Sequence, residues 1–323
     1  MTEMTVAAAG AGRMGRGLAI VFAYAGHPVR LVDLKKRQEA PAYLREAEAE
    51  ICKTLDMLVA CGMIGEADTD RIAGRIAYYD ASSAPEAVVG SDLIFEAAPE
   101  TVEAKQSTLK FLSDTCRPEV TIASTTSTFL SNRLQAMVSG PERFLNAHWL
   151  NPAFLVPLVE VSPGEKTDPD VTARLVTLLE AVGKVPVVCK ASPGFIVPRL
   201  QVMAMNEAAR MAEEGVASPE DIDKAIKFGF GFRFAVLGML EFIDWGGGDI
   251  LHYASQNMVE ATGEERFSAA KVIGDNMEAG RIGLRTGEGF LNYEGMDVPA
   301  YQQGRLKAFV DLLKHLELLR PPR

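Results

Sequence analysis

The chain is poor in cysteine and histidine, which narrows the chemistry open to it. Its four cysteines, Cys52, Cys61, Cys116 and Cys189, are scattered, with no CxxC or metal-like spacing. Such a distribution is typical of reduced thiols packed as small hydrophobic side chains, so we expect no metal site. Histidine is equally scarce, with four residues in 323. A histidine that lies close to a carboxylate is therefore a candidate for proton transfer.

Long apolar runs and a net positive charge are lacking as well. No window approaches the roughly 18 uninterrupted apolar residues of a membrane span, and the start, MTEMTVAAAGAGRMG, has no basic segment typical of a signal or transit peptide. The formal net charge is −10, which would repel nucleic acid and anionic membrane surfaces. We expect a cytoplasmic protein without nucleic-acid or membrane partners, in which backbone N–H groups or a few basic residues hold any phosphate.

Apolar runs alternate with helical stretches through the first part of the chain. The strand-like runs are residues 4–9, 29–33, 74–79, 91–98, 121–127, 143–150, 155–161 and 184–190. Residues 38–60 have the pattern of one long amphipathic helix. Alternation of this kind predicts an α/β fold with a Rossmann-type, doubly wound parallel sheet and one switch point.

Beyond about residue 190 the pattern becomes helical. Residues 196–214 predict a long helix whose methionines, Met203, Met205 and Met211, are expected in the core. Ser218-Pro219-Glu220 is a helix-start signal. We therefore expect two domains, a nucleotide-binding Rossmann domain at 1–190 and an all-helical domain at 191–323.

A glycine-rich turn follows the first strand-like run and opens a helix. Its pattern is GxGxxG, and Asp33 closes the next strand about 20 residues later. The first glycine would make the tight turn, the second would admit a pyrophosphate, and the third would let helix and strand pack closely. N–H groups at the helix start would bind the anion. The predicted binding residues are Gly10, Gly12, Arg13, Met14, Gly15 and Asp33.

Asp33 indicates which dinucleotide binds. A carboxylate there accepts hydrogen bonds from the ribose hydroxyls and would repel a 2′-phosphate, so NAD is favoured over NADP. Lys35, Lys36 and Arg37 follow directly and weaken this preference. The alternatives are a glycine-rich turn that only packs and an aspartate that only caps a strand.

The stretch NAHWLNPAFLVPLVEV, residues 146–161, contains His148 and Glu160. Oxidation of an alcohol releases a proton as well as a hydride, and histidine is the usual carrier of that proton. A carboxylate bonded to the second ring nitrogen would fix the tautomer and stabilise the imidazolium. Pro152 and Pro157 fit a loop that returns Glu160 on an adjacent strand. The alternative is a histidine that caps a strand and a glutamate at a sheet edge.

Eight motifs together resemble one enzyme family. They are GAGRMGRGLA, FEAAPETVEAKQ, IASTTST, RFLNAHWLNP, LVEV, SPGFIV, LEFID and TGEGF. In their order and spacing, over nearly the whole length, the chain is similar to the NAD-dependent 3-hydroxyacyl-CoA dehydrogenases. The resemblance implies reversible oxidation of an L-3-hydroxyacyl-CoA in fatty acid metabolism. It also implies a homodimer formed through the helical domain.

The resemblance implies roles for four catalytic residues. His148 would be the general base that takes the 3-hydroxyl proton, and Glu160 would be its electrostatic partner. Ser127 would hydrogen-bond the substrate oxygen, and Asn151 would support the site beside His148. The loop STTST also follows a strand-like run, and ligands bind at the carboxyl ends of strands in such sheets.

Two further residues would contact the cofactor according to the resemblance. Glu100 and Lys105, from PETVEAK, would lie along the nicotinamide and its ribose. From the residues alone, they have the pattern of a solvated pair at the start of a helix.

The chain departs from the family in ways that bear on the substrate. Pro198 stands in SPGFIVPRL where the family's motif has an asparagine that would contact the acyl part. The turn LVACGMIGEADTD lacks the lysines that many members present to coenzyme A. Arg233 lies between aromatic residues, as in the branch that contains gulonate dehydrogenase and lambda-crystallin, where it would clamp a free carboxylate. The open alternatives are an acyl-CoA, a free hydroxy acid held by Arg233, and a catalytically idle NAD-binding protein; a surface role for Arg233 is equally open.

Overall fold

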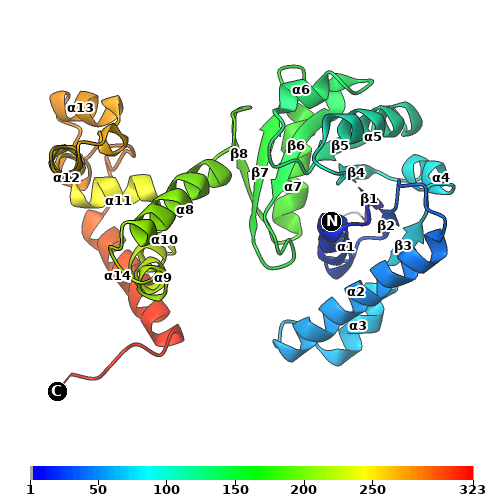
Figure 1. The fold of residues 1–323 in the computed structure, drawn as a ribbon, viewed down its shortest axis with the longest axis horizontal. Coiled ribbons are helices and arrows are strands. Elements are labelled where there is room, and N and C mark those ends of the chain that lie inside the picture. Colours follow the sequence, from blue (N-terminus) through cyan, green and yellow to red (C-terminus); the bar gives the residue numbers. More distant parts are fainter. Residues whose placement is uncertain (1–2, 323) are drawn as a thin grey trace. The chain divides into compact units, whose positions relative to one another are not determined.

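Eight short strands form one sheet in the computed structural model, which describes residues 3–322. They are β1 (Val6–Ala9), β2 (Val29–Val32), β3 (Ile76–Tyr79), β4 (Leu93–Glu96), β5 (Thr121–Ser124), β6 (Phe144–Trp149), β7 (Leu158–Pro163) and β8 (Val185–Val188). Their order is β3-β2-β1-β4-β5-β6-β7-β8, and β6 and β7 are the antiparallel neighbours (Figure 1). The strand order reverses between β1 and β4, which confirms the doubly wound Rossmann-type sheet.

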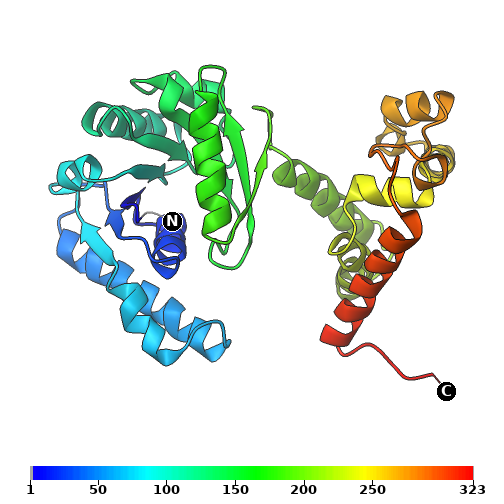
Figure 2. The ribbon, with the colours of Figure 1, turned by 180° about the vertical axis from the view of Figure 1, so that it is seen from behind.

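Helices cover both faces of this sheet. They are α1 (Arg13–Tyr24), α2 (Ala40–Ala60), α3 (Glu66–Ala73), α4 (Ala84–Val89), α5 (Val102–Thr115), α6 (Ser131–Gln135) and α7 (Pro169–Ala181). Side chains alternate along β1: Val6 and Ala8 pack with α1, α2, α3 and α7, whereas Ala7 and Ala9 pack with α4, α5 and α6. Helices α2 and α3 lie side by side (Figures 1 and 2). Because both faces are covered, ligands reach the sheet at its strand ends.

The chain divides into two compact units, one ending at Met205 and the other beginning at Asn206. This division falls within α8 (Val197–Glu213), the long helix expected at residues 196–214. The second unit is built from α9 (Pro219–Ala225), a π-helical segment (Ile226–Gly231), α10 (Phe232–Phe234), α11 (Met239–Gly246), α12 (Gly248–Thr262), α13 (Lys271–Glu278) and α14 (Val298–His315). Ser218 caps α9 by accepting from the Asp221 N–H, as its sequence predicted. The domain boundary at 190/191 stays a prediction.

The apolar side chains of α8 do not form a core within this chain. Met203 is 63% exposed and Met205 is 69% exposed, and no residue of α8 is buried. The expectation that these methionines lie in the core is therefore wrong for the single chain. The periodic pattern correctly indicated an apolar helix face, but periodicity does not say whether the same chain covers that face.

Membrane-spanning helices are not found in the part of the chain that the structure describes: no helix of residues 3–322 is both long and apolar enough.

Candidate active site

The glycine turn joins β1 to α1 at the carboxyl edge of the sheet. Gly10 has a φ of +134°, and a Cβ atom there would lie 2.4 Å from the carbonyl oxygen of Ala97. A Cβ atom on Gly15 would lie 1.8 Å from the carbonyl oxygen of Gly10. Both positions therefore require glycine for packing. A Cβ atom on Gly12 would meet nothing within 4 Å, so the space in front of Gly12 is open to a ligand.

The first turn of α1 faces this open space without a cap of its own. Gly12 is the N-cap residue and supplies no side-chain acceptor, and the helix begins with Arg13 and Met14. N–H groups in the first turn of a helix have no intrahelical partner and carry a partial positive charge. The turn therefore fits the pyrophosphate of a dinucleotide.

A cleft of about 540 Å³ lies beside the glycine turn. Asp33 lines it directly after β2, is 4% exposed and accepts a hydrogen bond from Arg37 Nε at 2.5 Å. The Arg37 guanidinium carbon lies 3.4 Å from the ring centroid of Tyr43, which lines the cleft as well. A carboxylate acceptor next to the stacked side chains of Arg37 and Tyr43 fits the adenosine of NAD. The Arg37 contact was not predicted, because its pairing with Asp33 depends on the course of the chain after β2.

The sheet places His148 directly opposite Glu160. The two residues are partners in the antiparallel pairing of β6 and β7, which is the adjacent-strand return expected for Glu160. His148 Nδ1 lies 2.7 Å from Glu160 Oε2, with the side chains 5% and 0% exposed. An ionised carboxylate can only accept, so Nδ1 carries the hydrogen, and in the neutral imidazole Nε2 then has the free lone pair. Within the described residues, Nε2 has no hydrogen-bond partner.

The second oxygen of Glu160 binds the start of α8. The backbone N–H groups of Ile196 and Val197 both donate to Oε1 at 2.8 Å. Burial raises the pKa of this carboxyl group, but the hydrogen bonds from His148, Val197 and Ile196 together outweigh it and hold the pKa below its ordinary value. Glu160 is therefore a buried carboxylate that stays ionised at neutral pH.

Phe195 is a site residue that the sequence did not reveal. Its ring is stacked on the His148 imidazole, with centroids 5.2 Å apart and planes 12° apart. The ring is 5% exposed, and the backbone φ of +46° lies in the left-handed region. The preceding residue, Gly194, also has a positive φ, of +75°. The motif SPGFIV marks a special turn, but only the backbone geometry shows that its aromatic ring meets the histidine.

The loop after β5 carries Ser127 and is held by Glu100. Glu100 Oε1 accepts hydrogen bonds from the Ser127 N–H at 2.9 Å and from the Thr128 N–H at 3.0 Å. The Ser127 hydroxyl has no partner in residues 3–322, and the residue is exposed. Lys105, in contrast, is buried, at 1% exposed, and pairs with Glu96 and Glu100. The structure thus adds Glu96, at the end of β4, to the predicted residues.

Asn151 lies between His148 and Glu160 in the sequence, and Pro198 follows them in the next helix. Asn151 is exposed, two residues after β6, and precedes Pro152 through a cis peptide bond. Pro198 is the second residue of α8. A proline there costs no helix hydrogen bond, because N–H groups in the first turn have no intrahelical acceptor. The fold therefore accommodates the departure from the family's asparagine.

Arg233 lies in the second unit and is exposed. Its guanidinium carbon is 5.4 Å from the ring centroid of Phe242. No carboxylate in the described part of the chain pairs with it. The cation is thus held against an aromatic ring and remains available to an anion.

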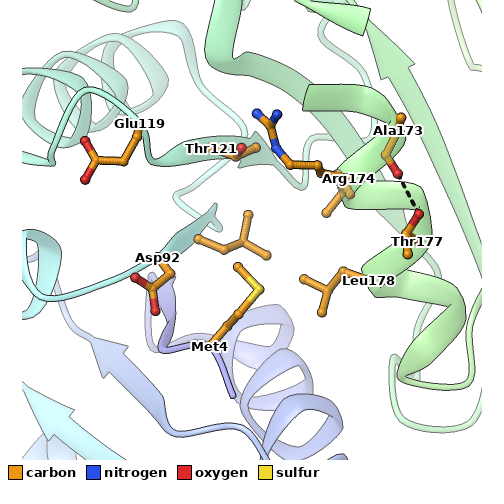
Figure 3. Close-up of a pocket in the computed structure, with 10 residues that line it drawn as sticks. Met4, Asp92, Glu119, Thr121, Ala173, Arg174, Thr177 and Leu178 are labelled. Carbon is orange, nitrogen blue, oxygen red and sulfur yellow. Dashed lines mark hydrogen bonds between the residues drawn. The ribbon is translucent and has the colours of Figure 1, made fainter. Parts of the chain in front are cut away.

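A second cavity, of about 520 Å³, lies at the opposite edge of the sheet (Figure 3). It is formed between α7 and the amino-terminal ends of β4 and β5, with Leu93, Thr121 and Leu178 among its lining residues. Its two carboxylates, Asp92 and Glu119, are both paired with Arg117. In doubly wound sheets ligands bind at the carboxyl ends of the strands. We therefore assign the active site to the edge that carries the glycine turn and His148.

A Rossmann unit with an open glycine turn and a histidine–carboxylate pair defines the class of NAD-dependent oxidoreductases. Comparison with known families then identifies the branch. The family model described as 3-hydroxyacyl-CoA dehydrogenase, NAD binding domain, matches residues 5–192, and the model of the C-terminal domain matches residues 194–293. The chain therefore belongs to the 3-hydroxyacyl-CoA dehydrogenase family, which confirms the resemblance seen in its motifs.

Individual relatives differ in the substrates that their names give. The chain is 31% identical over 313 residues to 5-formyl-3-hydroxy-2-methylpyridine 4-carboxylate 5-dehydrogenase of Mesorhizobium japonicum, covering 97% of this chain and 98% of the relative. It is 32% identical over 285 residues to a probable 3-hydroxybutyryl-CoA dehydrogenase of Deinococcus radiodurans, covering 88% and 98%. The crystal structure of a 3-hydroxyacyl-CoA dehydrogenase from Archaeoglobus fulgidus superimposes with a TM-score of 0.76 at 28% identity, over 98% of this chain and 100% of that one. Family and cofactor are thus established.

Proposed function

We propose that the protein oxidises the 3-hydroxyl group of an L-3-hydroxyacyl-CoA to the 3-oxo form, reversibly. The observation that carries this proposal is the 2.7 Å hydrogen bond between His148 Nδ1 and the buried carboxylate of Glu160. Because Nδ1 carries the hydrogen, Nε2 can take the hydroxyl proton as a general base. NAD, when bound, supplies the nicotinamide carbon that accepts the hydride.

Glu160 prepares His148 for this step in two ways. Its hydrogen bond to Nδ1 fixes the tautomer and the ring orientation before the substrate arrives. Its negative charge then stabilises the imidazolium that forms when Nε2 takes the proton. The N–H groups of Ile196 and Val197 keep the carboxylate ionised and in place.

The neighbouring residues are proposed to orient the substrate and the cofactor. Ser127 offers an unpaired hydroxyl, in the loop after the strand next to β6, for a hydrogen bond to the reacting oxygen. Asn151 is proposed to support the site beside His148. Glu100, which holds the loop that carries Ser127, is proposed to lie on the nicotinamide side of the site. Gly12 and the first turn of α1 are proposed to hold the pyrophosphate, and Asp33 the adenosine ribose.

A free hydroxy acid is the second candidate substrate. Arg233 is exposed and has no carboxylate partner in residues 3–322, and arginine binds carboxylates through two parallel hydrogen bonds. The relative from Mesorhizobium japonicum acts, by its name, on a pyridine carboxylate rather than on a thioester. Pro198 cannot make the side-chain contact of the asparagine that the family has there.

A substrate panel separates the two candidates. Steady-state rates with NAD are measured for 3-hydroxybutyryl-CoA and for free 3-hydroxybutyrate, gulonate and carnitine. Turnover of the thioester alone supports the proposal. Inert thioesters, with turnover of a free acid that is lost in Arg233→Lys, would establish the second candidate. NAD binding without turnover of any compound would favour the idle NAD-binding protein.

The proton-transfer step has its own test. Replacement of His148 by Ala should lower kcat by roughly 10²–10⁴-fold, because a general base contributes about that factor. NAD affinity, measured by titration, should not change. His315→Ala, at an exposed position near the end of α14, is the matched control and should keep wild-type kinetics. Wild-type turnover in His148→Ala would refute the mechanism.

We also propose that the protein is a cytoplasmic homodimer that assembles through its helical part. Large apolar side chains are exposed on helices of the second unit, including Phe228, Ile250 and Tyr253 at 51%, 61% and 57%. Exposed apolar area of this kind is typical of an interface. Sedimentation equilibrium should give twice the monomer mass, and a monomer at micromolar concentration would contradict the proposal.

A further inference from the structure

The Lys105 ammonium group has no hydrogen left for a cofactor. It lies 3.0 and 3.1 Å from the two carboxylate oxygens of Glu96 and 3.2 Å from the carbonyl oxygen of Ala98. Glu100 Oε2 lies 3.3 Å away. An ammonium group has three donors, and these four acceptors already surround it. With its side chain 1% exposed, Lys105 is an internal cation between two carboxylates.

Glu96 connects the Lys105 ammonium group to the carboxyl ends of two strands, β4 and β5. It is the last residue of β4, is 0% exposed, and is paired in register with Ser124, the last residue of β5. Its carboxylate also accepts from the Ser124 hydroxyl at 2.5 Å and from the Ala98 N–H at 2.6 Å. The segment after β4 is thereby fixed directly in front of the glycine turn, where Ala97 contacts Gly10.

Glu100 connects Lys105 to the loop after β5, which carries Ser127 and is called the serine loop here. Its Oε2 pairs with Lys105, and its Oε1 accepts from the Ser127 N–H, the Thr128 N–H and the Thr126 and Thr128 hydroxyls. Burial raises the pKa of Glu100, but the hydrogen bond from Thr126, the charge of Lys105 and the hydrogen bonds from Thr128 together lower it below its ordinary value. An ionised Glu100 can hold all of these donors together.

We infer that Glu96, Lys105 and Glu100 form one charge network that positions Ser127 for the substrate, and that Lys105 is a positioning residue rather than a ligand of NAD. The inference deepens the proposed function and rests on it for the role of Ser127. The network can be tested without measuring catalysis. Two of its hydrogen bonds are donated by backbone N–H groups, whose hydrogen exchange can be measured.

The first measurement is hydrogen exchange at the amides of Ser127 and Thr128. Lys105→Met removes the cation that holds Glu100, so exchange at these amides should rise roughly tenfold, the loss of one hydrogen bond's stabilisation. Lys110→Met is the matched control, because Lys110 lies on the same helix, is 71% exposed and pairs with Asp114 at the helix surface. Unchanged exchange in Lys105→Met would overturn the inference, whatever the substrate is.

The second measurement is a double-mutant cycle between Lys105→Met and Ser127→Ala. We expect Lys105→Met to lower kcat roughly 10–100-fold, the scale of a misplaced catalytic contact, with the Kd for NAD within about threefold of wild type. In the Ser127→Ala background the further loss should be less than about threefold, because coupled residues are not additive.

Several outcomes would overturn the inference. A tenfold weaker Kd for NAD, with a loss of kcat that is undiminished in Ser127→Ala, would make Lys105 a cofactor ligand. Wild-type kcat in Lys105→Met would make the network merely structural. Wild-type kcat in Ser127→Ala would remove the serine from the mechanism, whereas wild-type kcat in His148→Ala would refute only the proposed base. If Lys105→Met does not fold, Glu96→Gln with Lys105→Met removes both charges of the buried pair and is held to the same expectations.

Discussion

The ring of Phe195 is stacked on the imidazole of His148, with planes 12° apart and centroids 5.2 Å apart. The next two residues, Ile196 and Val197, donate their N–H groups to Glu160. One short segment at the start of α8 therefore contacts both members of the pair, the imidazole through a ring and the carboxylate through the backbone. Phe195 has a φ of +46°, a left-handed conformation that residues other than glycine rarely adopt.

Replacing Phe195 by Leu should lower kcat/KM by about tenfold, because the imidazole loses a flat contact that limits its orientation. The Kd for NAD should stay at its wild-type value. Phe22→Leu is the matched control, since Phe22 is fully buried beside Trp149 and away from the catalytic pair. That variant should lose thermal stability but keep its turnover. Full activity in Phe195→Leu would show that the stacking has no part in catalysis.

Glu160 should make the stability of the protein depend on pH. Burial raises its pKa, but the hydrogen bonds from His148, Val197 and Ile196 hold the folded value below the ordinary 4.5. A depressed carboxyl pKa stabilises the fold above the unfolded pKa, and this stabilisation is lost as the pH falls through the folded pKa. The difference in Tm between wild type and Glu160→Gln should thus be full at neutral pH and shrink below about pH 4.5. Thermal unfolding between pH 7 and pH 3 measures it; a difference that does not change with pH would contradict the expectation.

Asp33 should determine the choice between NAD and NADP, with Arg37 as the second factor. Asp33→Ser removes the carboxylate that is proposed to bind the ribose and frees Arg37 for a 2′-phosphate. We expect the ratio of kcat/KM for NADP to that for NAD to rise roughly 10–100-fold, the range of a charge-assisted hydrogen bond. In Asp33→Ser with Arg37→Met most of this gain should disappear. Equal ratios in the two variants would exclude a role for Arg37.

Gly12 and Gly15 of the turn should fail in different ways when a methyl group is added. Gly15→Ala should lower Tm sharply, because its Cβ would lie 1.8 Å from the Gly10 carbonyl oxygen. Gly12→Ala should keep the wild-type Tm, because its Cβ meets nothing within 4 Å, yet weaken NAD binding by tenfold or more. Scanning calorimetry and NAD titration separate the two effects. Tight NAD binding in Gly12→Ala would contradict the proposed pyrophosphate site.

Local patterns were enough to predict the sheet and the nucleotide turn. The alternation of strand-like and helical stretches predicted a doubly wound sheet, and GxGxxG followed by Asp33 predicted the dinucleotide site, because both depend on residues close together in the chain. The His148–Glu160 pair could also be predicted from the sequence, since a segment of twelve residues with two prolines can return as an adjacent strand. The exposed methionines of α8 show the limit, because periodicity identifies an apolar face and not its partner.

The sequence by itself determined the fold class, the cofactor and the candidate base. The tertiary structure alone decided what surrounds the base: the stacked ring of Phe195, the two amides on Glu160, and the buried Glu96–Lys105 pair behind the serine loop. These contacts join residues that no local pattern relates. Glu96 and Ser124 are brought together by strand register, Glu100 and Ser127 by two loops, and His148 and Phe195 by a strand and the segment before α8. Such contacts follow from the packing of the whole sheet, because only packing fixes where the strand ends meet.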